Sequence, residues 1–256
     1  MLDLSYYPKI RLYVPDKLSL KKIILLKPKQ AHYLKNVMRK RNKDFLLIFN
    51  EVNGEFLAEI ETSNKKNMTA KVIKKIRKPE KNTDIWVLFA PVKKTPTEYI
   101  IQKVTELGAS KILPVCTERT ITKSVNLKRM SEIAIEASEQ CERITVPEIL
   151  PMQKLMNVMD TWESKRKIYY ADESIRNEKE RSKKNDKLFA AFCGAILVGP
   201  EGGFSSQEID YLKQKEFIMP ISFGPRILRS DTAVITAMVL WHSLNGDMRN
   251  CFNVKD

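Results

Sequence analysis

Two short segments place glycine where the backbone could contact a ligand directly. The first is Leu197 to Ser206, LVGPEGGFSS, and the second is Ser222 to Thr232, SFGPRILRSDT. Their Gly-Pro pairs lie 25 residues apart, and together the segments hold four of the eight glycines in the chain. Glycine allows close approach of the backbone to a ligand and tolerates positive φ. A single loop of this kind would be an ordinary tight turn, but two of them predict a binding site.

Other common catalytic signatures are absent from the sequence. It contains neither G-x-x-x-x-G-K-[ST] nor G-x-G-x-x-G, which disfavours a P-loop and the usual dinucleotide site. His242 lies in an apolar segment typical of packed or interface residues, and His32 lies among basic residues, where a structural or RNA-facing role is expected. The four cysteines are widely spaced and form no CxxC pair. Neither a Ser-His-Asp triad nor a metal site is therefore expected.

Each glycine segment follows an apolar run and precedes a segment with helical character. GAILVGP predicts a strand that ends at Gly199, and Ser205 with Glu208 forms a capping box for the next helix. FIMPISFG predicts a strand that ends at Gly224, and Ser230-Asp231 is expected to cap the last helix. Ligands of open α/β sheets bind beyond the carboxyl ends of the strands, where both loops would lie.

Strands and helices alternate along the rest of the C-terminal part. IWVLFAPV, KILPVCTER and RKIYYADES predict strands, whereas TPTEYIIQKVTELGAS and RMSEIAIEASEQCER predict helices. Thr97 is expected to cap the first of these helices and Gly108 to end it. This alternation favours a parallel α/β sheet. The stretch from Asp172 to Lys187 is charged and lacks an apolar stripe, so a solvated loop or short surface helix is expected there.

The N-terminal part has β character instead. DFLLIFNEVNGEFLAEIET forms two apolar runs around Asn53-Gly54, a strong hairpin signal, and MTAKVIKKIR predicts a further strand. This spacing suits a small β-barrel or sandwich. The polar stretch RKPEKNTD (77–84) indicates a boundary. Two domains are therefore predicted, at residues 1–78 and 82–256.

Charge is distributed unevenly between these two parts. The chain has a net charge of +14, and residues 1–80, with 19 basic and 8 acidic side chains, account for +11 of it. Such asymmetry predicts a polyanionic partner. A lysine-rich proteome is the alternative, although it explains the total better than the asymmetry. The sequence shows no signal-peptide pattern and no apolar run of bilayer length, so a cytoplasmic protein without membrane contact is expected.

Several motifs together resemble the RsmE family, which methylates N3 of a uridine in 16S ribosomal RNA. They are spread over most of the chain and are specific in combination. The segments that carry the resemblance are HYLKNVMRKRNKD, IIQKVTELGASKILPVCTERT, EASEQCERITVPEI, LVGPEGGFSSQEI and SFGPRILRSDTA.

The resemblance implies a fold, a cofactor and partners. The fold is an α/β SPOUT methyltransferase domain with a C-terminal trefoil knot, preceded by a small PUA-like β-barrel domain that binds RNA. The cofactor is S-adenosyl-L-methionine, and the partners are 16S rRNA, or the assembling small subunit, and a second copy of the chain. In such a knot the consecutive loops wrap the cofactor, which explains the repeated glycines.

The sequence departs from the family pattern at a few positions. Phe223 replaces a usual leucine, and Asp231 replaces a usual glutamate, which weakens any catalytic role for that carboxylate. Cys141-Glu142 stands where a smaller pair is common. Asn42-Lys43 stands where a turn glycine is usual, and Asn42 is expected to adopt the left-handed conformation.

The resemblance also assigns catalytic candidates. Uridine N3 is protonated at neutral pH, so the enzyme must stabilise the negative charge that develops on the base. Arginine suits this task because it keeps its charge and presents a planar fork. Arg229 is the first candidate and Arg226 the second, with a phosphate contact or helix-end ion pair as the alternative for each. Glu201 is a candidate base or cofactor-positioning group, or a carboxylate that accepts bonds within its own loop.

Cofactor and RNA contacts follow in the same way. Cofactor contacts are expected mainly from the backbone, with Ile227 and Leu228 beside the adenine. The full set of expected cofactor residues is Leu197, Val198, Gly199, Pro200, Glu201, Gly202, Gly203, Ile221, Phe223, Gly224, Ile227 and Leu228. The expected RNA-binding residues are Arg11, Arg39, Lys40, Arg41, Lys94, Arg119 and Arg143.

The last helix, residues 232–244, is apolar almost all round and must be buried on more than one side. Burial in the core would explain this, and so would a dimer interface, which the resemblance favours. Two rival functions remain at this point: a SPOUT enzyme acting on another RNA such as tRNA, and a non-catalytic RNA-binding protein with the same fold.

Overall fold

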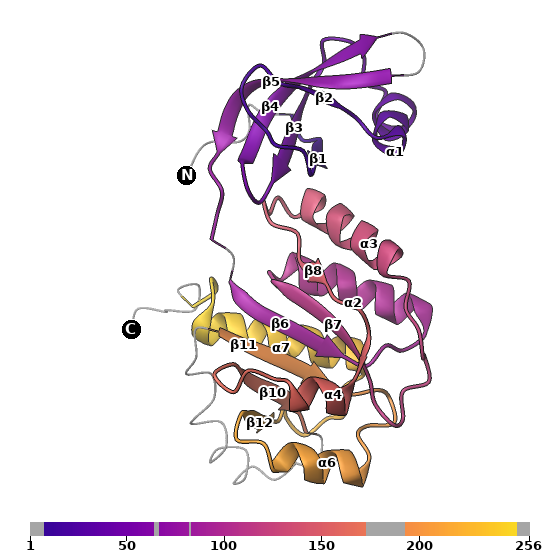
Figure 1. The fold of residues 1–256 in the computed structure, drawn as a ribbon, viewed down its shortest axis with the longest axis vertical. Coiled ribbons are helices and arrows are strands. Elements are labelled where there is room, and N and C mark those ends of the chain that lie inside the picture. The colour runs from indigo at the N-terminus through magenta and orange to yellow at the C-terminus, as the bar shows by residue number, and fades with distance from the viewer. Residues whose placement is uncertain (1–7, 64–66, 82, 173–192, 250–256) are drawn as a thin grey trace. The chain divides into compact units, whose positions relative to one another are not determined.

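The computed structural model describes residues 8–63, 67–81, 83–172 and 193–249 (Figure 1). The chain divides into two compact units, which we call the N-terminal unit (Met1–Lys81 with Ser138–Val146) and the C-terminal unit (Asn82–Ala137 with Pro147–Asp256). Most of the charged stretch between Asp172 and Lys187 lies outside the described residues. No helix among the described residues is long and apolar enough to cross a membrane.

The N-terminal unit is built on a five-stranded sheet, as its predicted β character requires. Its order is β1-β3-β4-β5-β2, with β1 parallel to β3 and the other neighbours antiparallel. A short helix continues into a π-helical turn beside this sheet. The elements are β1 (Arg11–Tyr13), β2 (Ile23–Leu25), α1 (Pro28–His32), η2 (Tyr33–Val37), β3 (Phe45–Asn50), β4 (Gly54–Ser63) and β5 (Asn67–Arg77).

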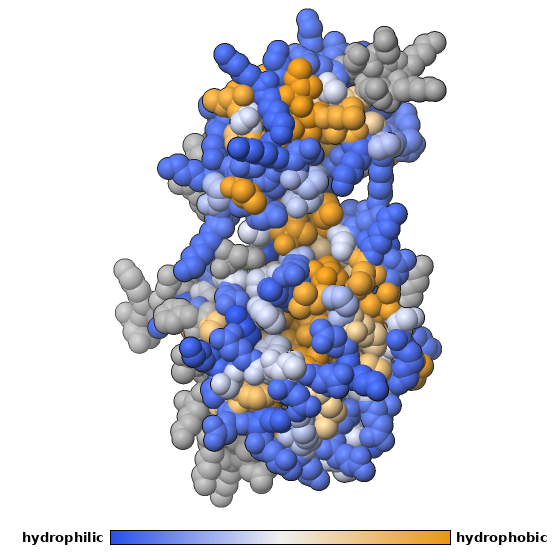
Figure 2. Space-filling view, viewed as in Figure 1, coloured by the Kyte–Doolittle hydropathy of each residue, from blue (hydrophilic) through white to orange (hydrophobic). Residues whose placement is uncertain are grey.

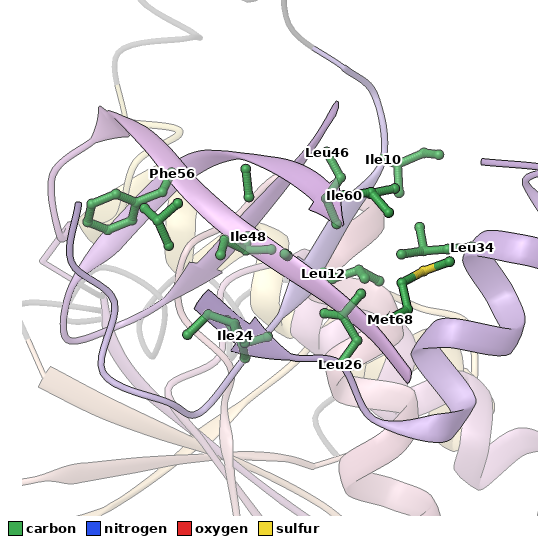
Figure 3. Packing of buried hydrophobic residues seen from close by; sticks show 14 of the residues in the cluster. Ile10, Leu12, Ile24, Leu26, Leu34, Leu46, Ile48, Phe56, Ile60 and Met68 are labelled. Atoms are coloured by element: carbon green, nitrogen blue, oxygen red, sulfur yellow. The ribbon is translucent and has the colours of Figure 1, made fainter. Parts of the chain in front are cut away.

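One hydrophobic cluster fills the N-terminal unit, with side chains from the sheet and from η2 pointing toward one another (Figure 3). Leu34, Leu46, Ile48 and Ile60 have no exposed surface. The edge strand β2 contributes only Ile24, because Ile23 and Leu25 on either side of it are exposed. Figure 2 accordingly shows apolar surface among the hydrophilic side chains of this unit.

The predicted hairpin is present, although its turn differs from a two-residue Asn-Gly turn. Residues 51–53 connect β3 to β4, and Asn50 pairs with Gly54. Only the glycine has positive φ, +90°, and a Cβ there would lie 2.2 Å from the Arg77 carbonyl oxygen. Asn53 instead uses its side-chain oxygen to accept a bond from the Leu18 N–H at 2.9 Å. Similarly, Lys43 rather than Asn42 has the left-handed conformation, with φ 73°.

Arg11 lies inside the N-terminal unit, which disfavours its predicted contact with RNA phosphate. Its side chain is 3% exposed, and its Nε lies 2.6 Å from the Glu55 carboxylate. The other guanidinium nitrogens donate to the carbonyl oxygens of Ser138, Glu139 and Arg143 at 2.8–3.0 Å. A buried charge is tolerated when it is paired and hydrogen-bonded in this way. These bonds join residues 138–146 to β1 within the unit, so we assign Arg11 a structural role.

The C-terminal unit contains the predicted parallel sheet. Every strand pair described in it is parallel, and the order is β12-β10-β11-β6-β7-β8, with β9 also paired to β7. The strands are β6 (Asp84–Phe89), β7 (Lys111–Cys116), β8 (Glu148–Ile149), β9 (Gln153–Lys154), β10 (Lys167–Ala171), β11 (Cys193–Val198) and β12 (Ile218–Ile221). The helices are α2 (Lys94–Glu106), α3 (Leu127–Gln140), α4 (Leu155–Asp160), α6 (Ser206–Lys213) and α7 (Ser230–Asn245), and α3 continues into the N-terminal unit.

Helices cover both faces of this sheet. On one face, Leu197 packs in a cluster with Leu155 of α4 and Leu212 of α6. On the other face lies α7, which contacts α2 and β11. Gly194 makes room for α7, because a Cβ at this position would lie 3.0 Å from Trp241 Nε1. The continuous apolar run of β11 is thus explained by burial on both sides.

The helix ends follow the predicted pattern with two differences. Gly108 ends α2 with φ +85°, as expected. Thr97 lies in the first turn of α2 rather than at its cap, and its hydroxyl contacts the Val92 backbone. Helix α7 begins at Ser230, so Arg229 takes the cap position and makes no side-chain cap bond.

Candidate active site

The two glycine-containing loops lie at the same edge of the sheet. The first glycine loop (residues 199–204) follows β11, and the second glycine loop (residues 222–229) follows β12. These strands both flank β10, whose end carries Ala171 and Asp172. Because the strands are parallel, all three carboxyl ends meet at this edge and enclose a cavity of about 490 Å³. That volume falls within the range of about 300–1,000 Å³ typical of small-molecule sites.

Backbone and hydroxyl bonds fix the loops relative to one another. Ser230, at the start of α7, donates its hydroxyl to the carbonyl oxygen of Gly199 at 3.0 Å and so joins the second glycine loop to the first. The N–H of Asp172 donates to the Ile221 carbonyl oxygen at 2.9 Å and joins the end of β10 to β12. Ser230 therefore links the loops instead of capping its helix.

Most of the predicted cofactor residues line the cavity. Leu197 is the exception, because its side chain is fully buried in the hydrophobic cluster that includes residues of α4 and α6. The predicted residues that line the cavity are Val198, Gly199, Pro200, Glu201, Gly202, Gly203, Ile221, Phe223, Gly224, Ile227 and Leu228.

Charged side chains of both signs surround the cavity. All three catalytic candidates, Glu201, Arg226 and Arg229, lie in its wall and are exposed. Arg119, predicted to bind RNA, also lines it and donates its Nη1 to the Gly202 carbonyl oxygen at 2.7 Å. Asp172 is a further lining residue. The cavity can therefore bind a ligand that carries both positive and negative groups.

Tyr170 and Asp172 were not predicted as site residues. The Tyr170 hydroxyl donates to Asp172 Oδ2 at 3.0 Å, and its ring packs edge-on against Phe204. Burial raises the pKa of Tyr170 well above its ordinary value, and the charge and hydrogen bond of Asp172 act in the same direction. The hydroxyl therefore stays protonated and keeps its bond to Asp172. The sequence signal that could have identified these two residues is their position at the end of a predicted strand.

Four of the remaining predicted RNA-binding residues, Arg39, Lys40, Arg41 and Arg143, belong to the N-terminal unit, whereas the cavity is lined by residues of the C-terminal unit. Arg39 and Arg41 are exposed and Lys40 is half-buried, in the N-terminal unit after η2. Arg143 is half-buried and donates to the Thr145 hydroxyl at 2.8 and 3.1 Å. Lys94 is the first residue of α2, but its side chain lies outside the described part of the structure.

Two glycines of the loops differ in what a side chain would cost the protein. Gly224 has φ +102° and open space around it, whereas a Cβ at Gly202 would meet Arg119 atoms at ordinary distances of 3.6 and 3.7 Å. We expect Gly224→Ala to lower the free energy of unfolding by about 1–3 kcal/mol through backbone strain. Gly202→Ala should leave it nearly unchanged. Thermal unfolding by circular dichroism measures both, and equal melting temperatures would contradict the strain at Gly224.

Comparison with known families defines the class of protein. The family model described as an RNA methyltransferase domain matches residues 79–242, and the model described as an RNA methyltransferase PUA domain matches residues 26–73. The chain is thus an RNA methyltransferase with a PUA domain.

Individual relatives narrow this class. The chain is 34% identical to the ribosomal RNA small subunit methyltransferase E of Rickettsia conorii, over 89% of this chain and 93% of that protein. The crystal structure of the enzyme of that name from Neisseria gonorrhoeae, bound to S-adenosyl methionine, matches with a TM-score of 0.82 and 26% identity, over 92% of this chain and 97% of that chain. A methyltransferase structure from Legionella pneumophila with bound SAM also has a TM-score of 0.82, with 28% identity over 93% of this chain and 98% of that chain. The chain belongs to the ribosomal RNA small subunit methyltransferase E family.

Proposed function

We propose that this chain transfers a methyl group from S-adenosylmethionine to N3 of a uridine in 16S rRNA of the small ribosomal subunit, in the cytoplasm. The observation that carries this proposal is the cavity between the two glycine loops. The relative from Neisseria gonorrhoeae, similar along 92% of this chain, was crystallised with S-adenosyl methionine. The relative from Rickettsia conorii is named as a methyltransferase of small-subunit rRNA.

The residues around the cavity fit the cofactor. The side chains of Ile221, Ile227 and Leu228 offer apolar surface for the adenine ring. The carboxylates of Glu201 and Asp172 suit an ammonium group, and nearby arginines suit a carboxylate. S-adenosylmethionine supplies a methyl group activated by its sulfonium.

The protein residues must then prepare the uridine. The base has to leave its stack to reach the cavity, and the loss of its N3 proton leaves negative charge on the ring. We assign stabilisation of this charge to Arg229, which lines the cavity from the cap position of α7. Arg226 is the second candidate on the same loop. Glu201, which also lines the cavity, is the candidate to accept the N3 proton or to orient the cofactor.

RNA affinity is proposed to come mainly from the N-terminal unit. Residues 1–80 carry most of the net charge, and exposed Arg39 and Arg41 with Lys40 form a basic group after η2. Such side chains contact phosphates without reading sequence. Arg119 is proposed to act at the cavity itself, where the target nucleotide enters.

We also propose the trefoil knot for the C-terminal unit. The strand order supports it. Along the chain, β10 is followed by β11, which lies between β10 and β6 in the sheet, and β12 then pairs with the other edge of β10. After β12 it turns back, so that α7 contacts β11 and α2. A return path of this kind brings the second glycine loop against the first.

A homodimer is proposed through the outward face of α7. Met238 and Trp241 are at most 1% exposed within the single chain, so they belong to its core. The outward face instead presents Leu240 and Leu244, which are 38% and 49% exposed. An exposed apolar stripe of this kind is typical of an interface.

We expect the double substitution Leu240→Glu and Leu244→Glu to yield a folded monomer, because it places charges in the proposed interface. Light scattering gives the mass and circular dichroism the fold. Met238→Glu serves as a contrast and should unfold the chain, since it buries a charge in the core. A monomeric unmodified protein at micromolar concentration would exclude the dimer.

Nucleoside mass spectrometry of 16S rRNA tests the proposed reaction. RNA from cells lacking this protein should lose one 3-methyluridine, and purified protein with S-adenosylmethionine should restore it on isolated small subunits. If the purified protein methylated tRNA instead of the small subunit, tRNA would be the target. If calorimetry detected no binding of S-adenosylmethionine at concentrations far above micromolar, a non-catalytic RNA-binding protein would be favoured.

A further inference from the structure

Glu208 has a second bond beyond its predicted role in the capping box of α6. The box is present: Ser205 Oγ accepts from the Glu208 N–H, and Glu208 Oε2 accepts from the Ser205 N–H at 2.9 Å. The other carboxylate oxygen, Oε1, accepts from the backbone N–H of Glu118 at 2.8 Å, 90 residues earlier in the chain. The residue is only 6% exposed. One buried carboxylate therefore joins the start of α6 to the segment that leaves β7.

The segment joined by Glu208 is a tight turn, residues 117–120, which we call the β7 turn. Thr117 and Thr120 are 3% and 2% exposed, and their hydroxyl oxygens lie 2.7 Å apart. The Thr120 hydroxyl also accepts from the Thr117 N–H at 2.9 Å. The two threonines anchor the ends of the turn, so that Glu118 and Arg119 lie at its tip.

The tip of the β7 turn reaches the first glycine loop through a second bond. Arg119, next to Glu118, donates its Nη1 to the carbonyl oxygen of Gly202 at 2.7 Å and lines the cavity. The first glycine loop is thus held against the β7 turn at two points, at Gly202 through Arg119 and at the start of α6 through Glu208.

The two bonds differ in how firmly they hold. The Arg119 side chain is long and exposed, so its contact alone restrains the loop weakly. The Glu208 bond joins a buried carboxylate to a backbone N–H, which is charge-assisted and shielded from water. Fixing the Glu118 N–H fixes the backbone of its neighbour Arg119, and therefore the point from which the guanidinium reaches Gly202.

We propose that Glu208 is a positioning residue for the cofactor cavity. It holds the β7 turn so that Arg119 and the first glycine loop keep the shape that binds the cofactor. This inference rests on the proposed function, because the ligand it concerns is S-adenosylmethionine. A capping residue alone would affect only the stability of α6.

Calorimetry with S-adenosylmethionine and thermal unfolding separate these two roles. Glu208→Gln keeps the size of the side chain but replaces one of two accepting oxygens with a donor, so one N–H must lose its partner. We expect it to raise the cofactor Kd about tenfold. The matched control is Ser205→Ala, which removes the hydroxyl of the capping box but retains the bond from Glu208 to Glu118. This control should lower the melting temperature and leave the Kd within about twofold of the unmodified protein.

A double-mutant cycle with Arg119→Ala tests the link from its other end without touching α6. If Glu208 acts through Arg119, the pair of substitutions should raise the Kd no more than the larger single effect. An unchanged Kd for Glu208→Gln, with a melting temperature lowered as in Ser205→Ala, would overturn the proposal. So would fully additive effects in the cycle. Absence of cofactor binding by the unmodified protein would instead overturn the proposed function.

Discussion

Replacing Arg229 with alanine is expected to slow single-turnover methylation by about 10²–10³-fold at saturating cofactor and RNA, the scale seen when one oxyanion donor is removed. The position of the Arg229 side chain indicates that it can be removed without disturbing the fold. Arg229 is exposed, lines the cavity and makes no cap bond with its own helix. Other groups hold its backbone in place: the Ser230 hydroxyl donates to the Gly199 carbonyl oxygen, and the Arg229 carbonyl oxygen accepts from the Ala233 N–H at 2.8 Å. The melting temperature should therefore change little.

Arg226→Ala is the matched control for this experiment. It removes the same charge from the same loop, and Arg226 is also exposed in the cavity wall. A much smaller loss of rate for Arg226→Ala would support the assignment of Arg229. Normal turnover of Arg229→Ala at saturation, with only RNA affinity reduced, would make Arg229 a positioning residue and transfer the catalytic role to Arg226 or Glu201.

Reversal of charge at Arg39, Lys40 and Arg41 to glutamate should weaken RNA binding across sequences while cofactor affinity stays the same. The variant loses phosphate contacts and adds repulsion. For each phosphate contact that is lost, RNA binding releases one fewer counterion. The magnitude of the slope of log K against log salt should therefore fall by roughly 2–3 units. Filter binding of rRNA fragments over a range of salt measures the slope, and calorimetry measures cofactor affinity.

Lys9, Lys17 and Lys78, changed together to glutamate, provide the control for net charge. These side chains are exposed in the same unit, and the change in total charge is identical. A specific basic contact predicts a smaller loss of affinity and slope for this control. Equal losses in the two variants would mean that the net charge of the unit, rather than the group after η2, attracts the RNA.

The sequence allowed prediction of elements better than of the contacts between them. The parallel sheet, the capping box of Ser205 and Glu208 and the two glycine loops depend on local pattern, and all are present. Arg11 was predicted to contact RNA phosphate together with the other basic residues of the N-terminal part. Its burial depends on Glu55 and on carbonyl oxygens more than 120 residues away, which no local pattern reports.

The site shows the same division between local and distant information. Its loops were predicted because glycine marks them, whereas the contribution of β10 was missed. Tyr170 and Asp172 enter the cavity because β10 pairs with both β11 and β12, an order that differs from the order along the chain. The second bond of Glu208 was missed for the same reason, since its partner Glu118 lies 90 residues earlier. Leu197 was placed in the site by its position beside the first glycine loop, but its side chain is fully buried in the cluster that includes residues of α4 and α6.

The discontinuous make-up of the N-terminal unit has a consequence for its synthesis. Arg11 and Glu55 lie within the first 81 residues, but the carbonyl oxygens that complete the bonding of Arg11 belong to residues 138–146. During translation these acceptors are made about 65 residues after the sheet, a delay of roughly 3–13 s at typical elongation rates. Through that interval the Arg11 guanidinium of a nascent chain lacks these three acceptors. The N-terminal unit can therefore reach its final form only after more than half of the protein has left the ribosome.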